Sequence, residues 1–156
     1  MSWDKGADRI DELVARGFLQ RVPASPQAAH LLIADARRHL QSAETIADAD
    51  PQGAYALTYD AARKAMAAVL EAQGLRATSA GGHVVLYDAA IAQFEPPLGH
   101  LFRPFNRMRV RRNQVEYAST DNPPITADEV RRDVIRTRRL VEDFALPAIE
   151  LVSGGR

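Results

Sequence analysis

The chain has 156 residues, a length that suits one domain, and its 46% hydrophobic and 26% charged residues are typical of a globular protein rather than a disordered one. The formal net charge is zero, which excludes a global field that would attract nucleic acid. No cysteine is present, so disulfides, thiol nucleophiles and thiolate metal sites are excluded as well.

Apolar residues recur at helical spacing from the N-terminus onward. They predict a short first helix over residues 4–18. Ser25-Pro26 and Asp50-Pro51 each place an N-cap residue before a proline, which predicts that the second and third helices begin there. The second helix is expected to run to about residue 49, and the third to stop at Gly74.

The segment 76–82 has the glycine-rich and polar composition of a loop. A shorter helix is expected after it, over residues 84–94, ended by Pro96-Pro97. Pro104 is then expected to open the next helix, and Asn122-Pro123-Pro124 to end it.

Thr126 and Glu129 form a capping-box pattern, which predicts the start of the last helix. Pro147 is expected to kink or end that helix, and strand alternation is absent. The sequence therefore predicts an all-α fold, an antiparallel up-and-down bundle of four main helices plus short extra helices. We expect a single domain over residues 1–156, with its core at about 26–145.

The beginning of the chain, Met1-Ser2-Trp3-Asp4-Lys5, leads into a charged stretch and not into the apolar core of a signal peptide. No run approaches the roughly 20 apolar residues that a membrane span needs. We therefore expect a cytoplasmic protein with no membrane partner.

One predicted helix is rich in arginine and carries one of these arginines on its apolar side. Arg112 falls on the same helical stripe as Phe105, Met108 and Val115. A guanidinium there cannot lose its charge, so it needs a carboxylate, a subunit interface or an anionic ligand. Glu116, four residues on, offers a purely structural partner worth at most about 0.5 kcal/mol. The arginines of this segment are Arg103, Arg107, Arg109, Arg111 and Arg112.

The hexamer Arg112-Asn113-Gln114-Val115-Glu116-Tyr117 resembles the signature of the HEPN superfamily. That signature is an Arg, usually followed by a polar residue such as Asn, and then a His a few residues further on. The segments 59–65 and 74–78 also resemble a bacterial HEPN branch. The resemblance covers roughly residues 26–145.

The resemblance implies an up-and-down bundle that forms a homodimer through its motif helices. It also implies a metal-independent ribonuclease of a toxin–antitoxin or defence system, with RNA as substrate and an antitoxin as partner. The Arg would stabilise charge on the scissile phosphate, and the His would move a proton at the ribose 2′-hydroxyl. Here Tyr117 takes the place of the His, and a phenol with an ordinary pKa near 10 is a poor general base. It can still donate a hydrogen bond to a phosphate or stack on a base.

The histidines outside the motif are candidates to replace its missing His. His83 and His100 could each reach the Arg112 site across the bundle or a dimer interface, although a lone His is more often a surface or capping residue. His30 and His39 do not share a helix face, and neither a metal site nor a cofactor is expected. The predicted site residues are Arg112, Asn113 and Tyr117 as catalytic groups, with Arg109, Glu116 and His83 as binding groups.

The third helix carries aromatic and charged residues for which a structural role is expected. Tyr55 and Tyr59, four residues apart, predict core packing rather than base stacking. Arg63 and Lys64 are expected to be solvated charges or interface pairs.

Two functions remain open from the sequence. The first is a HEPN-like domain that binds RNA or another phosphate-bearing ligand, with ribonuclease activity, and the arginine density favours it. The alternative is a non-catalytic helical dimerisation or interaction module that docks a partner such as an antitoxin, and the missing motif His favours that one.

Overall fold

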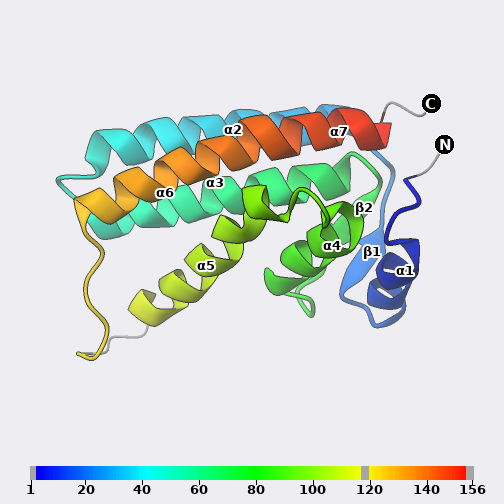
Figure 1. Ribbon diagram of the computed structural model, residues 1–156, viewed down its shortest axis with the longest axis horizontal. Helices are drawn as coiled ribbons and strands as arrows, with labels where there is room; N and C mark the ends of the chain where they lie inside the picture. The colour runs from blue at the N-terminus through cyan, green and yellow to red at the C-terminus, as the bar shows by residue number, and fades with distance from the viewer. Residues whose placement is uncertain (1–2, 117–119, 154–156) are drawn as a thin grey trace.

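The computed structural model describes residues 3–116 and 120–153, and most of them are helical (Figure 1). The all-α character expected from the sequence is therefore confirmed. The helices are α1 (Ala7–Ala15), α2 (Pro26–Ile46), α3 (Pro51–Glu71), α4 (Val84–Phe94), α5 (Gly99–Glu116), α6 (Ala127–Arg139), the π-helical turn η1 (Leu140–Ala145) and α7 (Leu146–Ser153).

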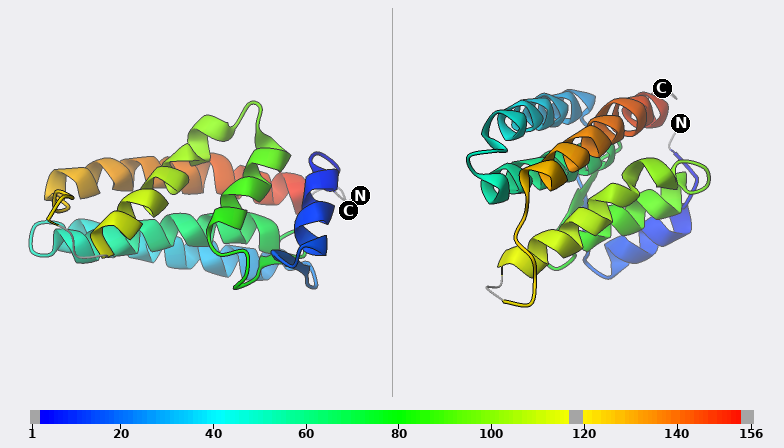
Figure 2. Two further views of the ribbon diagram at one scale, coloured as in Figure 1. Left: turned by 90° about the horizontal axis from the view of Figure 1, so that it is seen from below. Right: turned by 60° about the vertical axis from the view of Figure 1, so that its left-hand side comes forward.

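Three long helical rods lie side by side: α2, α3, and the continuous run of α6, η1 and α7 (Figure 1). The antiparallel pair of α2 and α3 has the most extensive contact. A second group, made of α1, α4 and α5, packs against one side of these rods (Figure 2). From its N-terminal end, α5 diverges from the rods, so its C-terminal half lies at the edge of the molecule.

Side-chain caps begin three of the helices where the sequence predicts them. Ser25, Asp50 and Thr126 each accept a hydrogen bond from the backbone N–H three residues ahead, at 3.0, 3.0 and 3.1 Å. Each cap satisfies a backbone donor that has no partner inside the helix. The predicted starts of α2, α3 and α6 are confirmed.

A two-stranded antiparallel sheet, β1 (Leu19–Arg21) with β2 (Leu75–Ala77), corrects the prediction of a chain without strands. Each strand has three residues, which is too short for a recognisable alternation of apolar and polar positions. Gly74 lies in the turn that follows α3 and has a φ of 79°, a conformation that favours glycine. Its carbonyl oxygen accepts a hydrogen bond from the backbone N–H of Val22. The chain therefore leaves α3 as a strand before it enters the predicted loop.

Two prolines lie elsewhere in their helices than expected. Pro104 does not open α5 but lies inside it, because the helix already begins at Gly99 and loses only one backbone hydrogen bond at the proline. Pro147 does not end the last rod, which continues to Ser153. The wider turn η1 directly precedes Pro147 and gives room to the carbonyl that the proline ring would otherwise meet.

Aromatic side chains join the two groups of helices. The ring centroid of Phe144 in η1 lies 4.7 Å from that of Phe102 in α5 and 5.2 Å from that of Phe94 in α4. Tyr59 of α3 stacks on Phe105 of α5 at 5.6 Å. These buried contacts set the position of α5, and therefore of Arg112, relative to α3.

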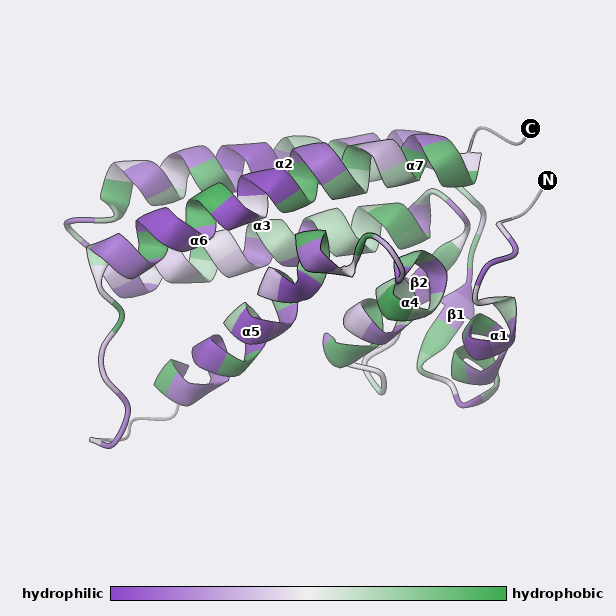
Figure 3. Ribbon diagram, in the orientation of Figure 1, coloured by the Kyte–Doolittle hydropathy of each residue, from purple (hydrophilic) through white to green (hydrophobic). Residues whose placement is uncertain are grey.

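Hydrophobic residues of the inner helices face one another, whereas α6 is strongly hydrophilic along its outer side (Figure 3). Within residues 3–116 and 120–153, no helix is both long enough and apolar enough to cross a membrane.

Candidate functional site

Tyr59 lies at the centre of the candidate site and connects three helices. Its side chain is almost fully buried, and its hydroxyl lies 2.5 Å from Nδ1 of His83, the residue that precedes α4. The guanidinium carbon of Arg112, from α5, lies over the Tyr59 ring at 5.1 Å from the centroid. This is the distance of a cation–π contact. The structure therefore brings two predicted site residues, Arg112 and His83, to opposite parts of one tyrosine.

The hydrogen bond between Tyr59 and His83 has a preferred direction. Burial raises the pKa of the Tyr59 phenol to about 12, against the opposing positive charges of Arg112 and its neighbours. The hydroxyl therefore keeps its proton at neutral pH. Donating that proton to Nδ1 of His83 leaves the imidazole hydrogen on Nε2. In this tautomer His83 offers an N–H donor at its other nitrogen.

Positive charge surrounds His83. Although the residue is largely exposed, partial burial of its ring lowers the pKa of His83, and the charges of Arg63, Arg112 and Arg109 lower it further while Asp60 opposes them. His83 is therefore neutral at pH 7. An anion bound between these groups would oppose the arginines and raise that pKa.

The predicted ion pair between Arg112 and Glu116 is present, with Nη2 3.0 Å from Oε1. The Arg112 side chain is 33% exposed and that of Glu116 is 51% exposed. Arg112 thus has an aromatic and a carboxylate contact within one chain. Of the three partners expected for Arg112, a carboxylate, a subunit interface or an anionic ligand, the structure shows the carboxylate.

The other predicted motif residues differ in their surroundings. Arg109 donates two hydrogen bonds to the amide oxygen of Asn106, at 3.0 and 3.2 Å, so this contact leaves its charge unneutralised. The side chain of Asn113 is exposed and has no hydrogen bond to another side chain within residues 3–116 and 120–153. Tyr117 lies outside the described residues, and its predicted contact with Asn113 stays a prediction.

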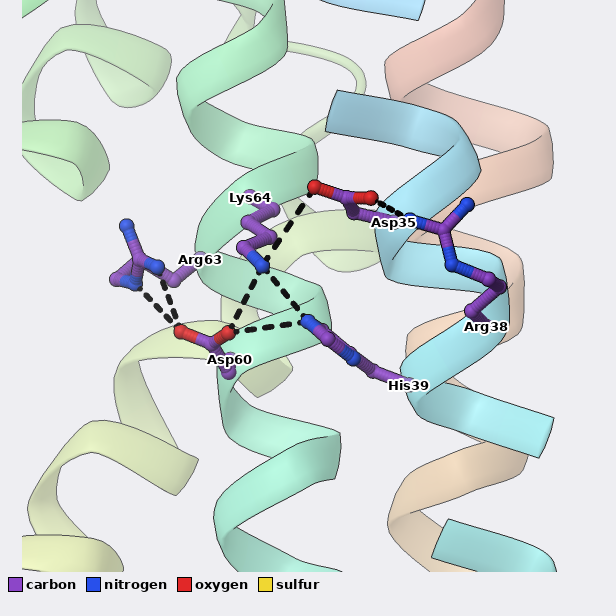
Figure 4. A network of polar contacts seen from close by, with 6 residues as sticks. All are labelled: Asp35, Arg38, His39, Asp60, Arg63 and Lys64. Carbon is purple, nitrogen blue, oxygen red and sulfur yellow. Dashed lines mark hydrogen bonds and ion pairs between the residues drawn. The ribbon is translucent and has the colours of Figure 1, made fainter. Parts of the chain in front are cut away.

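Arg63 lies beside the site, although a solvated charge or an interface pair was expected from the sequence. Its Nε and Nη2 donate to Oδ1 of Asp60 at 2.9 and 2.6 Å, and the guanidinium points away from α2 (Figure 4). Its side chain is only 29% exposed. Because Arg63 follows Tyr59 by four residues, both lie on one face of α3, and this spacing was the signal that could have revealed it.

Asp60 connects Arg63 to a polar network between α3 and α2. Its Oδ2 lies 3.3 Å from both Nζ of Lys64 and Nε2 of His39, and Lys64 lies 3.8 Å from Asp35 (Figure 4). Burial raises the pKa of the Asp60 carboxyl, but the hydrogen bonds and charges of Arg63 and Lys64 outweigh it and hold the pKa below its usual range. Of the two roles expected for Lys64, a solvated charge or an interface pair, the structure shows pairing with Asp60 and Asp35 between α3 and α2.

The remaining arginines of α5 are engaged elsewhere. Arg103 pairs with Glu95 at 2.6 Å, Arg111 with Glu129 at 2.8 Å, and Arg107 approaches Asp133 at 3.7 Å. Three of the five arginines of α5 therefore form structural ion pairs, and the other two, Arg109 and Arg112, belong to the site.

Within one chain, His100 does not reach the site, and its approach across a dimer interface stays a prediction. It lies at the start of α5, where its Nδ1 is 3.2 Å from the carbonyl oxygen of Pro97. Twelve residues separate it from Arg112, which is about 18 Å along the helix axis. Across residues 3–116 and 120–153, no three His, Asp or Glu side chains gather as a metal site.

Known proteins provide no relative for comparison: no family model, no curated protein and no solved structure matches the chain. The resemblance to the HEPN superfamily therefore rests on the sequence pattern around Arg112. Any function has to be inferred from that pattern and from the groups that surround Tyr59.

Proposed function

We propose that this protein is a HEPN-like domain that binds RNA, or another phosphate-bearing ligand, at the cationic cluster of Arg63, Arg109, Arg112 and His83. The observation that carries the proposal is that Arg112 of α5 and His83, which precedes α4, both contact Tyr59 of α3. Arg63 and Arg109 add positive charge beside the same two residues, Tyr59 and His83. The three arginines outnumber the nearby carboxylates, Asp60 and Glu116.

Phosphate suits the donors of this cluster. A guanidinium can bind two phosphate oxygens at once through its parallel N–H groups. The Nε2–H of neutral His83 would add a second kind of donor. Because the Arg112–Glu116 pair is exposed, it is worth little, and Arg112 can exchange the carboxylate for a phosphate at small cost.

Metal-independent cleavage of the bound RNA is part of the proposal, but the geometry supports binding more strongly. A histidine that accepts a hydrogen bond from Tyr59 at Nδ1 carries its proton on Nε2, so it is a donor and not a base in that state. Deprotonating a ribose 2′-hydroxyl would require the other tautomer. Cleavage assays in the presence of a chelator would show whether RNA is a substrate or only a ligand.

The alternative is a non-catalytic module that binds a second copy or a protein such as an antitoxin. The observation that favours it is the Arg112–Glu116 ion pair, which gives the motif arginine a structural partner within its own helix. The replacement of the motif His by Tyr117 favours it too.

Replacing Arg112 distinguishes the two functions. We expect Arg112→Ala to weaken the binding of a short single-stranded RNA by about 10- to 150-fold, the equivalent of a lost charge-assisted hydrogen bond pair. Arg107→Ala is the matched control, because it removes the same charge from a more exposed position on the same helix. Fluorescence anisotropy across a salt series measures both, since each lost phosphate contact should lower the salt slope by about one.

Equal RNA affinities of Arg112→Ala and Arg107→Ala would mean that Arg112 contacts no phosphate. The cluster would then be structural, and the interaction module would be the better proposal.

A further inference from the structure

A cavity of about 430 Å³ opens directly beside the cationic cluster. It lies between α3, β2 and the start of α4, and its volume is in the range of small-molecule sites. Arg63 and His83, which belong to the cluster, also line the cavity. A ligand whose phosphate binds the cluster would therefore have the rest of its bulk at the mouth of this cavity.

One part of the cavity wall is apolar, and Thr78 and Ser79 add polar groups elsewhere in the lining. The apolar part is formed by Ala67 and Leu70 of α3, Leu75 of β2 and Leu86 of α4, of which the three leucines are buried. Planar groups lie at one end, the guanidinium of Arg63 and the imidazole of His83. Such groups stack on flat aromatic rings.

A polar pair, Glu71 and Arg76, lines the end of the cavity that lies away from Arg63 and His83. Arg76 of β2 donates to both carboxylate oxygens of Glu71, at 2.6 and 3.3 Å. Glu71 follows Arg63 by eight residues, so the two ends of the cavity are about 12 Å apart along α3. The pair presents an acceptor and several donors to the edge of any ring that enters the cavity.

We propose that this cavity, lined by Arg63, Ala67, Leu70, Leu75 and His83, binds the nucleobase next to the phosphate held by the cationic cluster. The inference rests on the proposed function, because it places the base relative to that phosphate. A nucleobase has apolar faces for the leucine walls and a polar edge for Glu71 and Arg76. The protein thus reads RNA as a base attached to a phosphate and not as a chain of charges alone.

The test compares two ligands of equal charge on the wild-type chain: a short single-stranded RNA and a ribose-phosphate chain of the same length without bases. If bases enter the cavity, the RNA binds roughly 5- to 150-fold more tightly than the abasic chain, the range for stacking of one base on an aromatic side chain. Equal affinities for the two ligands would overturn the proposal without touching the phosphate site.

A substitution that fills the cavity tests whether the preference for RNA over the abasic chain arises there. Ala67→Met adds bulk to a half-buried wall position, so it should remove the preference for RNA and leave the affinity for the abasic chain unchanged. Ala34→Met is the control, because Ala34 is a half-buried alanine of α2 outside the cavity. A preference that survives Ala67→Met would place the base elsewhere and contradict the proposal.

The phosphate site has its own readout in the same experiment. Arg112→Ala should lower the affinity for the abasic chain and the affinity for the RNA by the same factor. If the wild-type chain does not bind the abasic ligand and Arg112→Ala changes nothing, the proposed function itself fails.

Discussion

Tyr59 has two roles within a single side chain: its ring contacts Arg112 and its hydroxyl contacts His83. The spacing of Tyr55 and Tyr59 correctly predicts that both are buried in the core. It could not predict the contact with His83, because 24 residues that include a strand and a loop separate the two. Contacts between distant segments depend on the path of the chain, which periodicity does not encode.

Removing the Tyr59 hydroxyl should separate these two roles. We expect Tyr59→Phe to lower the free energy of unfolding by about 1 kcal/mol, the net worth of one hydrogen bond, while the ring keeps its contact with Arg112. His83→Ala should cost a similar amount. Because both changes remove one interaction, a double-mutant cycle from urea denaturation should show that the two losses do not add. Additive losses would mean that the hydroxyl and His83 do not interact in solution.

Between α2 and α3, the polar network of His39, Asp60 and Lys64 gives the helix pair a dependence on pH. Nε2 of His39 lies 2.7 Å from Nζ of Lys64 and 3.3 Å from Oδ2 of Asp60. The shorter contact identifies Nε2 as an acceptor for the lysine, so His39 is neutral despite its nearby carboxylate. Burial lowers the pKa of His39, and the charge of Lys64 lowers it further.

A histidine whose pKa is lower in the folded than in the unfolded chain destabilises the fold when it is protonated. The stability linked to His39 is therefore complete above the unfolded pKa of about 6.5 and is lost as the pH falls through the folded value. We expect His39→Gln, which cannot titrate, to reduce the loss of unfolding free energy between about pH 7.5 and pH 5.5. Urea denaturation at each pH measures it, with His30→Gln on the same helix as control. If the unfolding free energy of His39→Gln falls with pH as steeply as that of the wild type, His39 does not contribute to the pH dependence.

The elements themselves were predictable to the extent that their signals are local. Caps at Ser25, Asp50 and Thr126 act within one turn, and each predicted start is confirmed. The strands β1 and β2 depend on pairing between segments more than 50 residues apart, and no local pattern marks them. The passage of the last rod through Pro147 depends on η1, whose π-helical bonding has no sequence signal of its own.

At the scale of the whole molecule, the homodimer stays a prediction. The resemblance to HEPN domains implies that two copies of α5 face each other, and Val110 on that helix is 44% exposed. We expect sedimentation velocity to show a dimer at micromolar concentrations, and Val110→Glu to shift it toward monomer. Ile135→Glu, at a 54% exposed position of α6, should leave the dimer intact. A wild-type chain that sediments as a monomer at high micromolar concentration would rule out this assembly.

The pKa of His83 reports on whether phosphate binds at the cluster around Tyr59. Partial burial and then the charges of the three arginines lower the pKa of His83 in the free protein, and a bound phosphate would neutralise part of that positive charge. By linkage, RNA binding should then strengthen as the pH falls through the pKa of His83. The pKa of this ring is measured separately from affinity, and it responds to the charge and the burial that a bound ligand brings to the ring.

The most direct measurement is an NMR titration of the His83 ring protons against pH, in the free protein and with a saturating short RNA. We expect a pKa below the usual value for histidine in the free protein and an upward shift with RNA. If an RNA binds the protein but leaves the pKa of His83 unchanged, its phosphates lie elsewhere and not at the cluster around Tyr59.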